Sequence, residues 1–293
     1  MKKRILVTGA TGLIGRELAK TSITDDYDVY AITSRQGPQN NTYQWINANL
    51  FNQDEIGKLI ANIRPHHLLH LAWATTEDYL SSPINQRFLD SGISLAQQFA
   101  SYGGQRAVFA GSCLEYKFKD VPLKETDELD VMKYEYTRCK HELHQKAAKI
   151  FRASNVEFAY CRIFYVFGHG EHPKRLTPSV IHGLRSGQGL SIKSGPLQKD
   201  YMYSREIARA FLEVLNSSAT GTFNICSGNP ISIRDYALTI AHLLNRENLL
   251  SFDDSCTGQP AVILGDNSRL TNEIGFVPSY TTTTALAEIL KEG

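Results

Sequence analysis

The sequence predicts an α/β fold, namely a doubly wound parallel sheet with a smaller C-terminal lobe. Three observations lead to this prediction. Short apolar runs alternate with helical patterns through the first half of the chain, which is typical of a parallel sheet covered by helices on both faces. The first apolar run ends in a glycine-rich turn. From about Gly168 onward, glycines and prolines recur and the helical patterns become short and separated.

The elements of the first half follow from local patterns. Strands are expected where short apolar and β-branched runs are bounded by polar or turn residues. These runs lie at residues 4–8, 29–33, 43–46, 67–71, 107–110 and 156–164. Helices are expected between them, at residues 16–21, 53–62, 86–102 and 135–153. We place the first domain at residues 1–167 and the second lobe at 168–293, with a segment at about 200–215 returning to the first domain.

The composition narrows the range of functions. The chain of 293 residues carries 31 basic and 30 acidic residues, and this balance gives no indication of binding to nucleic acid or to an anionic membrane surface. Its five cysteines lie far apart without a C-x-x-C pair, which argues against a zinc site or a disulfide framework and fits a reducing compartment. No apolar run approaches the length of about 18 residues that a membrane helix needs. A cytoplasmic protein without a metal site is therefore expected, one that binds neither nucleic acid nor membrane.

Three glycines, Gly9, Gly12 and Gly15, follow the first strand and open the first helix. Glycine permits a tight turn, close approach of the backbone to a pyrophosphate, and close packing of helix on strand. The helix N-terminus then offers free N–H groups and the positive end of its dipole. The spacing G-x-x-G-x-x-G differs from the dehydrogenase fingerprint G-x-G-x-x-G, and a purely structural loop is the alternative. The strand and helix around the turn favour a dinucleotide site.

The end of the second strand indicates which dinucleotide is bound. NAD enzymes of this architecture carry an acidic residue there, which binds the ribose hydroxyls. This chain has Thr33, Ser34 and Arg35 instead, so a carboxylate is missing and a guanidinium is available for a 2′-phosphate. NADP(H) is therefore predicted in preference to NAD. The alternative is that Arg35 is a solvated loop residue.

A tyrosine, a lysine and a serine form the candidate catalytic group. The stretch YTRCK places Tyr136 and Lys140 four residues apart in an expected helix, and therefore on one face. A neighbouring ammonium would lower the pKa of the Tyr136 phenol from its usual value of about 10 toward neutral pH. Ser112 follows the fifth strand at the carboxyl edge of the sheet, where its hydroxyl could hydrogen-bond a substrate carbonyl. Alone, Y-x-x-x-K is common on exposed helices, but behind a dinucleotide turn and a serine-bearing strand it indicates catalysis.

With these features the chain resembles the extended short-chain dehydrogenase/reductases, the nucleotide-sugar epimerase, dehydratase and reductase group, over nearly its whole length. The motifs are TGATGLIG at 8–15, NANL at 47–50, HLAW at 70–73, RIFYVFG at 162–168 and KDYMYSREIARA at 199–210. The resemblance implies a Rossmann domain that binds NADP(H) and a second lobe that binds a nucleoside-diphosphate sugar. It assigns catalysis to Ser112, Tyr136 and Lys140, with Lys140 also on the nicotinamide ribose.

The resemblance also implies which residues contact the ligands. Those implied for the cofactor are Gly9, Thr11, Gly12, Leu13, Ile14, Gly15, Ser34, Arg35, Asn49, Leu50, Leu71, Ala72, Trp73, Tyr136, Lys140, Phe164 and Val166. Those implied for the substrate are Ser112, Cys113, Tyr165, Arg175 and Lys199. Three of these depart from the family's pattern. Asn49 replaces an acid, Lys199 replaces a phosphate-binding arginine, and Tyr165 stands where asparagine is usual.

Other departures narrow the reaction. The 4,6-dehydratases of the family carry an Asp-Glu pair directly after the serine or threonine, whereas this chain has Cys113 and Leu114. Glu115 could replace that pair only by reaching the sugar, which alternation along an extended segment disfavours. The 3,5-epimerase/reductases use a cysteine and a histidine. Alignment on Tyr116 puts Leu114 at the cysteine position, and Arg175 in the segment KRLTP stands at the histidine position. Neither reaction is therefore expected.

Reduction of a C4 ketone and 4-epimerisation remain, since both use the same trio. Epimerases usually keep one NAD bound and recycle it, whereas a reductase consumes a nicotinamide in each turnover and normally uses NADPH. Arg35 therefore favours NADPH-dependent reduction of a nucleoside-diphosphate 4-keto-6-deoxysugar. A 4-epimerase with tightly bound NAD(P) is the alternative, and a non-catalytic NADP-sensing regulator is a further one. By the same resemblance, the helices at 86–102 and 135–153 would form the four-helix interface of a homodimer, although their apolar residues are equally compatible with packing on the sheet.

Overall fold

The computed structural model of the protein describes residues 2–35, 37–38, 43–75, 77–255 and 260–292. The chain forms two compact units. The first consists of Met1–Lys117, Glu128–Ile163 and Ala208–Phe223, and the second of Phe118–Asp127, Phe164–Ile207 and Asn224–Gly293. The chain therefore passes from one unit to the other more than once.

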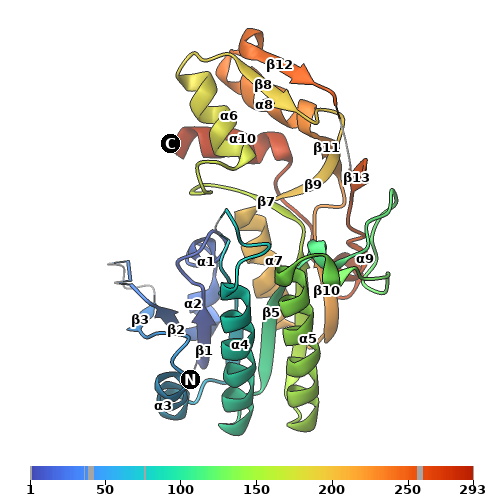
Figure 1. Cartoon of the computed structure of the whole chain (residues 1–293). Coiled ribbons are helices and arrows are strands. Elements are labelled where there is room, and N and C mark those ends of the chain that lie inside the picture. The colour runs from blue at the N-terminus through green and yellow to red at the C-terminus, as the bar shows by residue number, and fades with distance from the viewer. Residues whose placement is uncertain (1, 36, 39–42, 76, 256–259, 293) are drawn as a thin grey trace. The chain divides into compact units, whose positions relative to one another are not determined.

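A seven-stranded sheet forms the centre of the first unit, in the order β10-β6-β5-β4-β1-β2-β3 (Figure 1). From β6 to β3, every neighbouring pair is parallel. The order reverses where β4 and β2 flank β1, which is the arrangement of a doubly wound sheet and confirms the predicted fold class. The strands are β1 (Lys3–Thr8), β2 (Tyr27–Thr33), β3 (Gln44–Asn47), β4 (His67–His70), β5 (Arg106–Ser112), β6 (Glu157–Ile163) and β10 (Gly221–Ile225).

Three helices of the first unit share one buried apolar cluster with the sheet. They are α3 (Gln53–Ile63), α4 (Ile84–Ser101) and α5 (Glu135–Ala153), and α4 and α5 lie side by side (Figure 1). Leu95, Phe109 and Phe151 are fully buried in this cluster, and their removal from water stabilises the unit. Strands β1 to β6 and these helices agree with the sequence prediction to within a few residues, and α5 has the predicted bounds, whereas β10 was not predicted.

The helix after the glycine turn is shorter than the predicted segment 16–21. Helix α1 spans only Gly15–Leu18, and a second short helix, α2 (Ile23–Asp26), follows it. The N–H groups of Lys20 and Thr21 donate to the carbonyls of Glu17 and Leu18 (both 3.0 Å), three residues earlier, so the chain tightens after α1. The Thr21 hydroxyl donates to the same Leu18 carbonyl (2.7 Å). Because α1 has only 4 residues, the dipole expected at the turn is smaller than that of a full helix.

The second unit contains a four-stranded sheet and a separate pair of parallel strands. The four strands are β7 (Tyr165–Phe167), β9 (Gln198–Tyr203), β11 (Pro230–Ser232) and β13 (Val262–Ile263), and the pair is β8 (Leu190–Lys193) with β12 (Leu250–Asp253). The helices are α6 (Leu176–Arg185), α8 (Ile233–Leu244), α9 (Ser268–Asn272) and α10 (Thr282–Glu292), while α7 (Ser204–Asn216) leads back into the first unit.

The prediction of short helices in this half is wrong for three of them. Helices α6, α8 and α10 have 10, 12 and 11 residues. Several of the glycines and prolines behind the prediction lie between elements, as Gly187 and Pro196 do. Pro178 lies in the first turn of α6, where the missing N–H has no intrahelical partner to lose.

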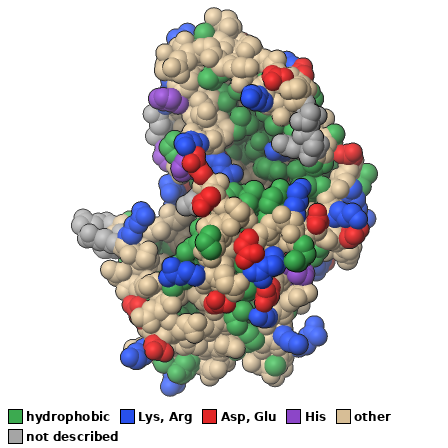
Figure 2. Space-filling view, in the orientation of Figure 1, with side chains coloured by type: hydrophobic (Ala, Val, Ile, Leu, Met, Phe, Trp, Pro, Cys, Tyr) green, Lys and Arg blue, Asp and Glu red, His purple; other side chains and the backbone are tan. Residues whose placement is uncertain are grey.

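Charged side chains of both signs are interspersed on the face of the molecule shown in Figure 2. Along α4 and α5, Arg138 forms ion pairs with Glu135 and Glu142 and donates a hydrogen bond to Gln86 across the two helices. The homodimer interface expected on these helices stays a prediction. No helix in the described part of the chain combines the length and hydropathy that a membrane crossing requires.

Asp200 is a fully buried carboxylate on β9 that holds two loops of the second unit. It accepts hydrogen bonds from the Ser227 N–H (2.8 Å), the Ser227 hydroxyl (2.6 Å), the Gly228 N–H (3.0 Å) and the Gly265 N–H (3.3 Å). Each of these donors needs an acceptor, because an unpaired buried N–H destabilises the fold. The carboxylate therefore organises the chain around Lys199.

We expect Asp200→Asn to lower the free energy of unfolding by about 2–3 kcal/mol, because the amide N–H₂ turns a donor toward backbone donors. Chemical denaturation of the purified variant measures this loss. Asp235→Asn is the matched control, since Asp235 is exposed on α8 and an amide oxygen can still accept from the Ser232 hydroxyl. Equal stability of the two variants would contradict this role of Asp200.

Candidate active site

The glycine turn leaves no room for side chains. Gly9 has a φ of +73°, and a Cβ there would lie 2.7 Å from the backbone nitrogen of Ala72. A Cβ on Gly15 would lie 2.2 Å from the carbonyl oxygen of Gly9. The turn is closed by a hydrogen bond from the Gly12 N–H to the Gly9 carbonyl (2.9 Å). A bare backbone at the carboxyl end of β1 fits the pyrophosphate of a dinucleotide.

The segment after β4 lies against this turn. The Thr8 hydroxyl and His70 Nδ1 are 2.7 Å apart, and the same hydroxyl accepts a hydrogen bond from the Ala72 N–H (3.3 Å). The Leu71 N–H donates to the Thr8 carbonyl (3.1 Å). Residues predicted for the cofactor on two different strands are therefore neighbours in the structure.

The predicted adenosine-side residues lie at the ends of β2 and β3. Ser34 and Arg35 are exposed, and the Arg35 N–H donates to the Thr33 hydroxyl (3.2 Å). Residues 36 and 39–42 of the same loop lie outside the described part of the chain. The Asn49 side chain accepts a hydrogen bond from the Phe51 N–H (3.0 Å), so its amide oxygen holds the turn that leads to α3.

Ser112, Tyr136 and Lys140 come together in the first unit. Ser112 ends β5, while Tyr136 and Lys140 lie one turn apart on α5, and all three side chains are buried. The Ser112 hydroxyl interacts with the Tyr136 phenol and acts to lower its pKa. The Tyr136 ring makes edge contacts with Trp73 (6.0 Å between centroids) and Tyr79 (5.0 Å), which fix its orientation.

The Lys140 ammonium has its own partners. It donates a hydrogen bond to the Ala110 carbonyl (2.7 Å) and lies over the Trp73 ring, 4.1 Å from the centroid. Burial lowers the pKa of Lys140 to about 7, although the charge of Glu115 acts in the opposite direction. Trp73 was predicted to contact the cofactor, and here it also holds Lys140 and Tyr136.

The predicted lowering of the Tyr136 pKa is wrong for this structure. Burial raises the pKa of the phenol above its usual value, and the hydrogen bond from Ser112 only partly offsets this. The Lys140 ammonium is directed to the Ala110 carbonyl and lies 5.9 Å from the centroid of the Tyr136 ring. The phenol is therefore held in its protonated form at neutral pH.

The sequence predicted an extended segment around Glu115, and this prediction is wrong. Residues Cys113–Glu115 form a 3₁₀ turn that returns the Glu115 carboxylate to the N–H of Ser112 (2.8 Å). The same carboxylate accepts hydrogen bonds from the Tyr160 hydroxyl (2.9 Å) and from Nε of Arg162 (3.4 Å). The sequence carried the signal for this turn, because S-x-x-E is the spacing of a capping box. Sequence reasoning considered Glu115 only as a group that could reach the sugar, and it missed Tyr160 and Arg162 as the partners of its carboxylate.

Further predicted residues belong to the second unit. The Lys199 ammonium lies over the ring of Tyr165, 4.5 Å from its centroid, so the structure brings these two candidates together. The Phe164 N–H donates to the carbonyl of Ile225 (3.1 Å), and Val166 lies on β7. Arg175 directly precedes α6.

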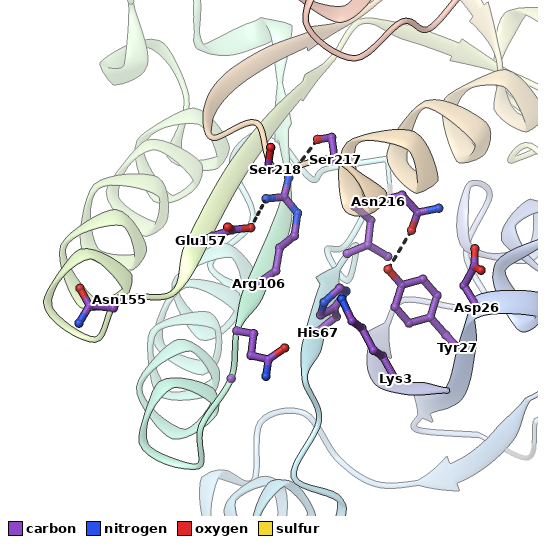
Figure 3. Close-up of a pocket in the computed structure, with 13 residues that line it drawn as sticks. Lys3, Asp26, Tyr27, His67, Arg106, Asn155, Glu157, Asn216, Ser217 and Ser218 are labelled. Atoms are coloured by element: carbon purple, nitrogen blue, oxygen red, sulfur yellow. Dashed lines mark hydrogen bonds and ion pairs between the residues drawn. The ribbon is translucent and has the colours of Figure 1, made fainter. Parts of the chain in front are cut away.

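A cavity of about 800 Å³ lies at the amino ends of the strands of the seven-stranded sheet (Figure 3). Its lining includes the first residues of β1, β2, β4, β5 and β6, which are Lys3, Tyr27, His67, Arg106 and Glu157. None of the predicted site residues lines it. Since open α/β sheets bind ligands at the carboxyl ends of their strands, the trio and the glycine turn form the candidate active site.

Comparison with curated proteins gives distant relatives. The chain is similar to UDP-glucuronic acid decarboxylase 1 of Danio rerio, with 23% identity over 265 residues, 86% of this chain and 63% of the relative. It thus spans less than two thirds of that relative. It is also similar to dTDP-4-dehydro-6-deoxyglucose reductase of Escherichia coli, with 21% identity over 309 residues, 99% of this chain and 97% of the relative.

Solved structures with the same fold include two epimerases. UDP-N-acetylglucosamine 4-epimerase from Methanobrevibacter ruminantium M1, in complex with UDP-N-acetylmuramic acid, has a TM-score of 0.87, 23% identity and coverage of 99% of this chain and 98% of that one. UDP-glucose 4-epimerase from Thermus thermophilus, in complex with NAD, has a TM-score of 0.85, 17% identity and 98% coverage of both chains.

The family is decided by a match that extends over most of the chain. The model of the NAD dependent epimerase/dehydratase family matches residues 5–226, a range that contains the glycine turn, the trio and the beginning of the second unit. This protein therefore belongs to the NAD dependent epimerase/dehydratase family.

Proposed function

We propose that this protein reduces the C4 ketone of a nucleoside-diphosphate 4-keto-6-deoxysugar with NADPH. The observation that carries the proposal is the group of three buried side chains, Ser112 at the end of β5 with Tyr136 and Lys140 one turn apart on α5. A similar curated protein is a dTDP-4-dehydro-6-deoxyglucose reductase, which supports the choice of substrate class. Arg175 and Lys199 are the cations that we propose for the diphosphate, because guanidinium and ammonium groups bind phosphate oxygens.

The chain's own residues would perform the proton chemistry. When bound along the glycine turn, NADPH would supply the hydride that C4 receives. Ser112 donates a hydrogen bond to the ketone oxygen as that oxygen gains negative charge. Tyr136 then gives its phenolic proton to the same oxygen, and the ketone becomes an alcohol. Because burial raises the pKa of Tyr136, the phenol carries this proton throughout the neutral pH range.

Arg35 supports NADPH over NADH. Its exposed guanidinium after β2 can bind a 2′-phosphate, and this position lacks the acidic residue that binds the ribose hydroxyls in NAD enzymes. We expect the protein to bind NADPH at least about tenfold more tightly than NADH, and Arg35→Ala to remove most of this difference. Nicotinamide fluorescence titrations measure both affinities. Arg152→Ala, an exposed position at the end of α5, is the control and should keep the preference. Equal affinities in the unaltered protein would remove the argument for NADPH.

A substrate screen tests the reaction itself. Nucleotide-activated 4-keto-6-deoxysugars are incubated with the protein and NADPH, and oxidation of NADPH is followed by absorbance. The matching 4-hydroxy sugars are tested in parallel for inversion at C4. Turnover of a keto sugar with stoichiometric loss of NADPH supports the reductase, whereas inversion without net loss of cofactor contradicts it.

The 4-epimerase with tightly bound NAD(P) is the second candidate, because it would use the same Ser112, Tyr136 and Lys140. The similar solved structures include epimerases, one of them in complex with NAD. Protein that retains one equivalent of nicotinamide cofactor through purification would favour this candidate. The gathered trio argues against the non-catalytic regulator, for which a buried Tyr–Lys pair would have no use.

A further inference from the structure

Glu115 is a buried carboxylate next to the proposed catalytic residues, and its side chain is fully removed from solvent. Its three hydrogen-bond donors come from two strands: the Ser112 N–H from β5, and the Tyr160 hydroxyl and Arg162 Nε from β6. Burying a charge without partners is strongly unfavourable, so these three donors stabilise the buried carboxylate.

The same network reaches helix α5. The Tyr160 hydroxyl also contacts the carbonyl of Lys140 (3.2 Å), and the Tyr160 ring stacks on His144 with 3.9 Å between centroids. One carboxylate thus connects the strand end that carries Ser112 with the helix that carries Tyr136 and Lys140.

The charged and titratable groups around Glu115 come from every neighbouring element. Arg162 on β6 is the cation at the carboxylate, and its guanidinium also lies over the Tyr116 ring (4.6 Å). His141 and His144 on α5 are kept neutral, since burial lowers the pKa of both, to about 3 for His144. Burial also lowers the pKa of His70 on β4 to about 3, and the charge of Lys140 acts in the same direction.

A metal ion is the competing interpretation of this cluster. Glu115, His141 and His144 offer ligand atoms that lie within 4.8 Å of one another. However, the Glu115 carboxylate already accepts three hydrogen bonds, and the Arg162 guanidinium would lie beside any bound cation. Two positive charges around one buried carboxylate repel each other strongly at low dielectric. The Glu115 carboxylate is therefore better described as a hydrogen-bonded partner of Ser112, Tyr160 and Arg162 than as a metal ligand.

We propose that Glu115 is a positioning residue of the active site, which fixes the end of β5 at Ser112 and supplies the negative charge that balances the Lys140 ammonium. The catalytic part of this inference rests on the proposed function, whereas the electrostatic part depends only on the fold. The Glu115 carboxylate is bonded to protein groups, and it acts through Ser112, Tyr160 and Lys140.

The electrostatic part has a definite sign. The charge of Glu115 raises the pKa of Lys140 and also raises the pKa of the Tyr136 phenol. Without that charge, both pKa values fall, so Lys140 loses its proton at a lower pH and the phenol ionises more easily. Nearby charges of this kind shift a pKa by about one unit or more. Both changes move the loss of reductase activity at alkaline pH to a lower pH.

The first experiment follows Lys140 by NMR, with ¹³C-labelled lysine and the signal assigned by its loss in Lys140→Arg. We expect Glu115→Gln to lower the pKa of Lys140, about 7 in the unaltered protein, by about one unit. Glu157→Gln is the matched control. Glu157 pairs with the buried Arg106 at the other end of the same two strands (Figure 3) and should leave the Lys140 pKa in place. An unchanged Lys140 pKa in Glu115→Gln would overturn the inference.

Glu115→Gln leaves the Arg162 cation buried without its partner, which can prevent folding. The double variant Glu115→Gln/Arg162→Gln removes both charges, and it should show a smaller fall in the Lys140 pKa, because losing the Arg162 cation partly offsets the loss of the Glu115 charge. Glu115→Asp keeps the charge and should keep the Lys140 pKa, although its shorter side chain no longer reaches the Ser112 N–H. A fall as large in Glu115→Asp as in Glu115→Gln would mean that geometry, and not charge, controls Lys140.

The second experiment measures the pH profile of NADPH-dependent turnover. In Glu115→Gln we expect kcat at pH 8 to fall at least about tenfold, the alkaline limb to move down by about one unit, and the KM for NADPH to change by less than about threefold. Glu157→Gln should keep the profile of the unaltered protein. If the unaltered protein turns over no nucleotide sugar, the proposed function fails, and the NMR titration still decides the role of the Glu115 charge.

Discussion

Tyr136→Phe is expected to reduce turnover by about a thousandfold, which is the range in which a positioned proton donor contributes to an enzyme's rate. The variant removes only the hydroxyl. Its ring can keep the edge contacts with Trp73 and Tyr79, so the fold and the glycine turn should be unaffected. NADPH should therefore still bind, with an affinity within about threefold of the unaltered protein. Single-turnover kinetics and a fluorescence titration measure the two quantities separately.

The control for this variant is Tyr102→Phe, at the exposed end of α4, where the hydroxyl has no proposed role and turnover should stay unchanged. An active Tyr136→Phe protein would show that another group delivers the proton to the ketone oxygen. Loss of both turnover and NADPH binding would instead indicate that the phenol supports the fold of the site.

Gly15→Ala is expected to abolish high-affinity dinucleotide binding and to destabilise the first unit. The added Cβ would lie 2.2 Å from the Gly9 carbonyl oxygen and 2.6 Å from the Ala10 Cα. Both are backbone atoms, so the turn itself has to move, and overpacking of this kind costs about 1–3 kcal/mol. A displaced turn no longer presents its backbone to the pyrophosphate, and we expect the affinity for NADPH to fall at least about tenfold.

Fluorescence titration and thermal denaturation measure the two effects of Gly15→Ala. Gly189→Ala is the matched control, because the nearest atom to its Cβ is the Leu249 carbonyl oxygen at 3.9 Å, an ordinary contact. Unchanged NADPH affinity in Gly15→Ala would place the dinucleotide elsewhere in the first unit. It would also remove the structural basis for the proposed reaction.

The sequence determined the fold class and the order of the main elements in the first unit. The alternation of apolar runs and helical patterns is a local property, and it was sufficient to place β1, β5 and α5. The positions of Ser112 and Tyr136 also followed from the sequence, because a strand end and a helix face place their residues without knowledge of distant contacts. After Leu18 the helix prediction was wrong, because the backbone there changes to hydrogen bonds between residues three apart, from Lys20 to Glu17 and from Thr21 to Leu18.

Only the tertiary structure decided the electrostatics of the site. The Lys140 ammonium bonds the Ala110 carbonyl, 30 residues earlier in the chain, and Glu115 meets Arg162 across two strands. Burial, which no local pattern reports, raises the pKa of Tyr136 where the spacing to Lys140 alone suggested the opposite. The sequence could therefore identify the groups that carry protons. Their protonation states depend on how much water the fold removes from them and on which distant charges it brings close.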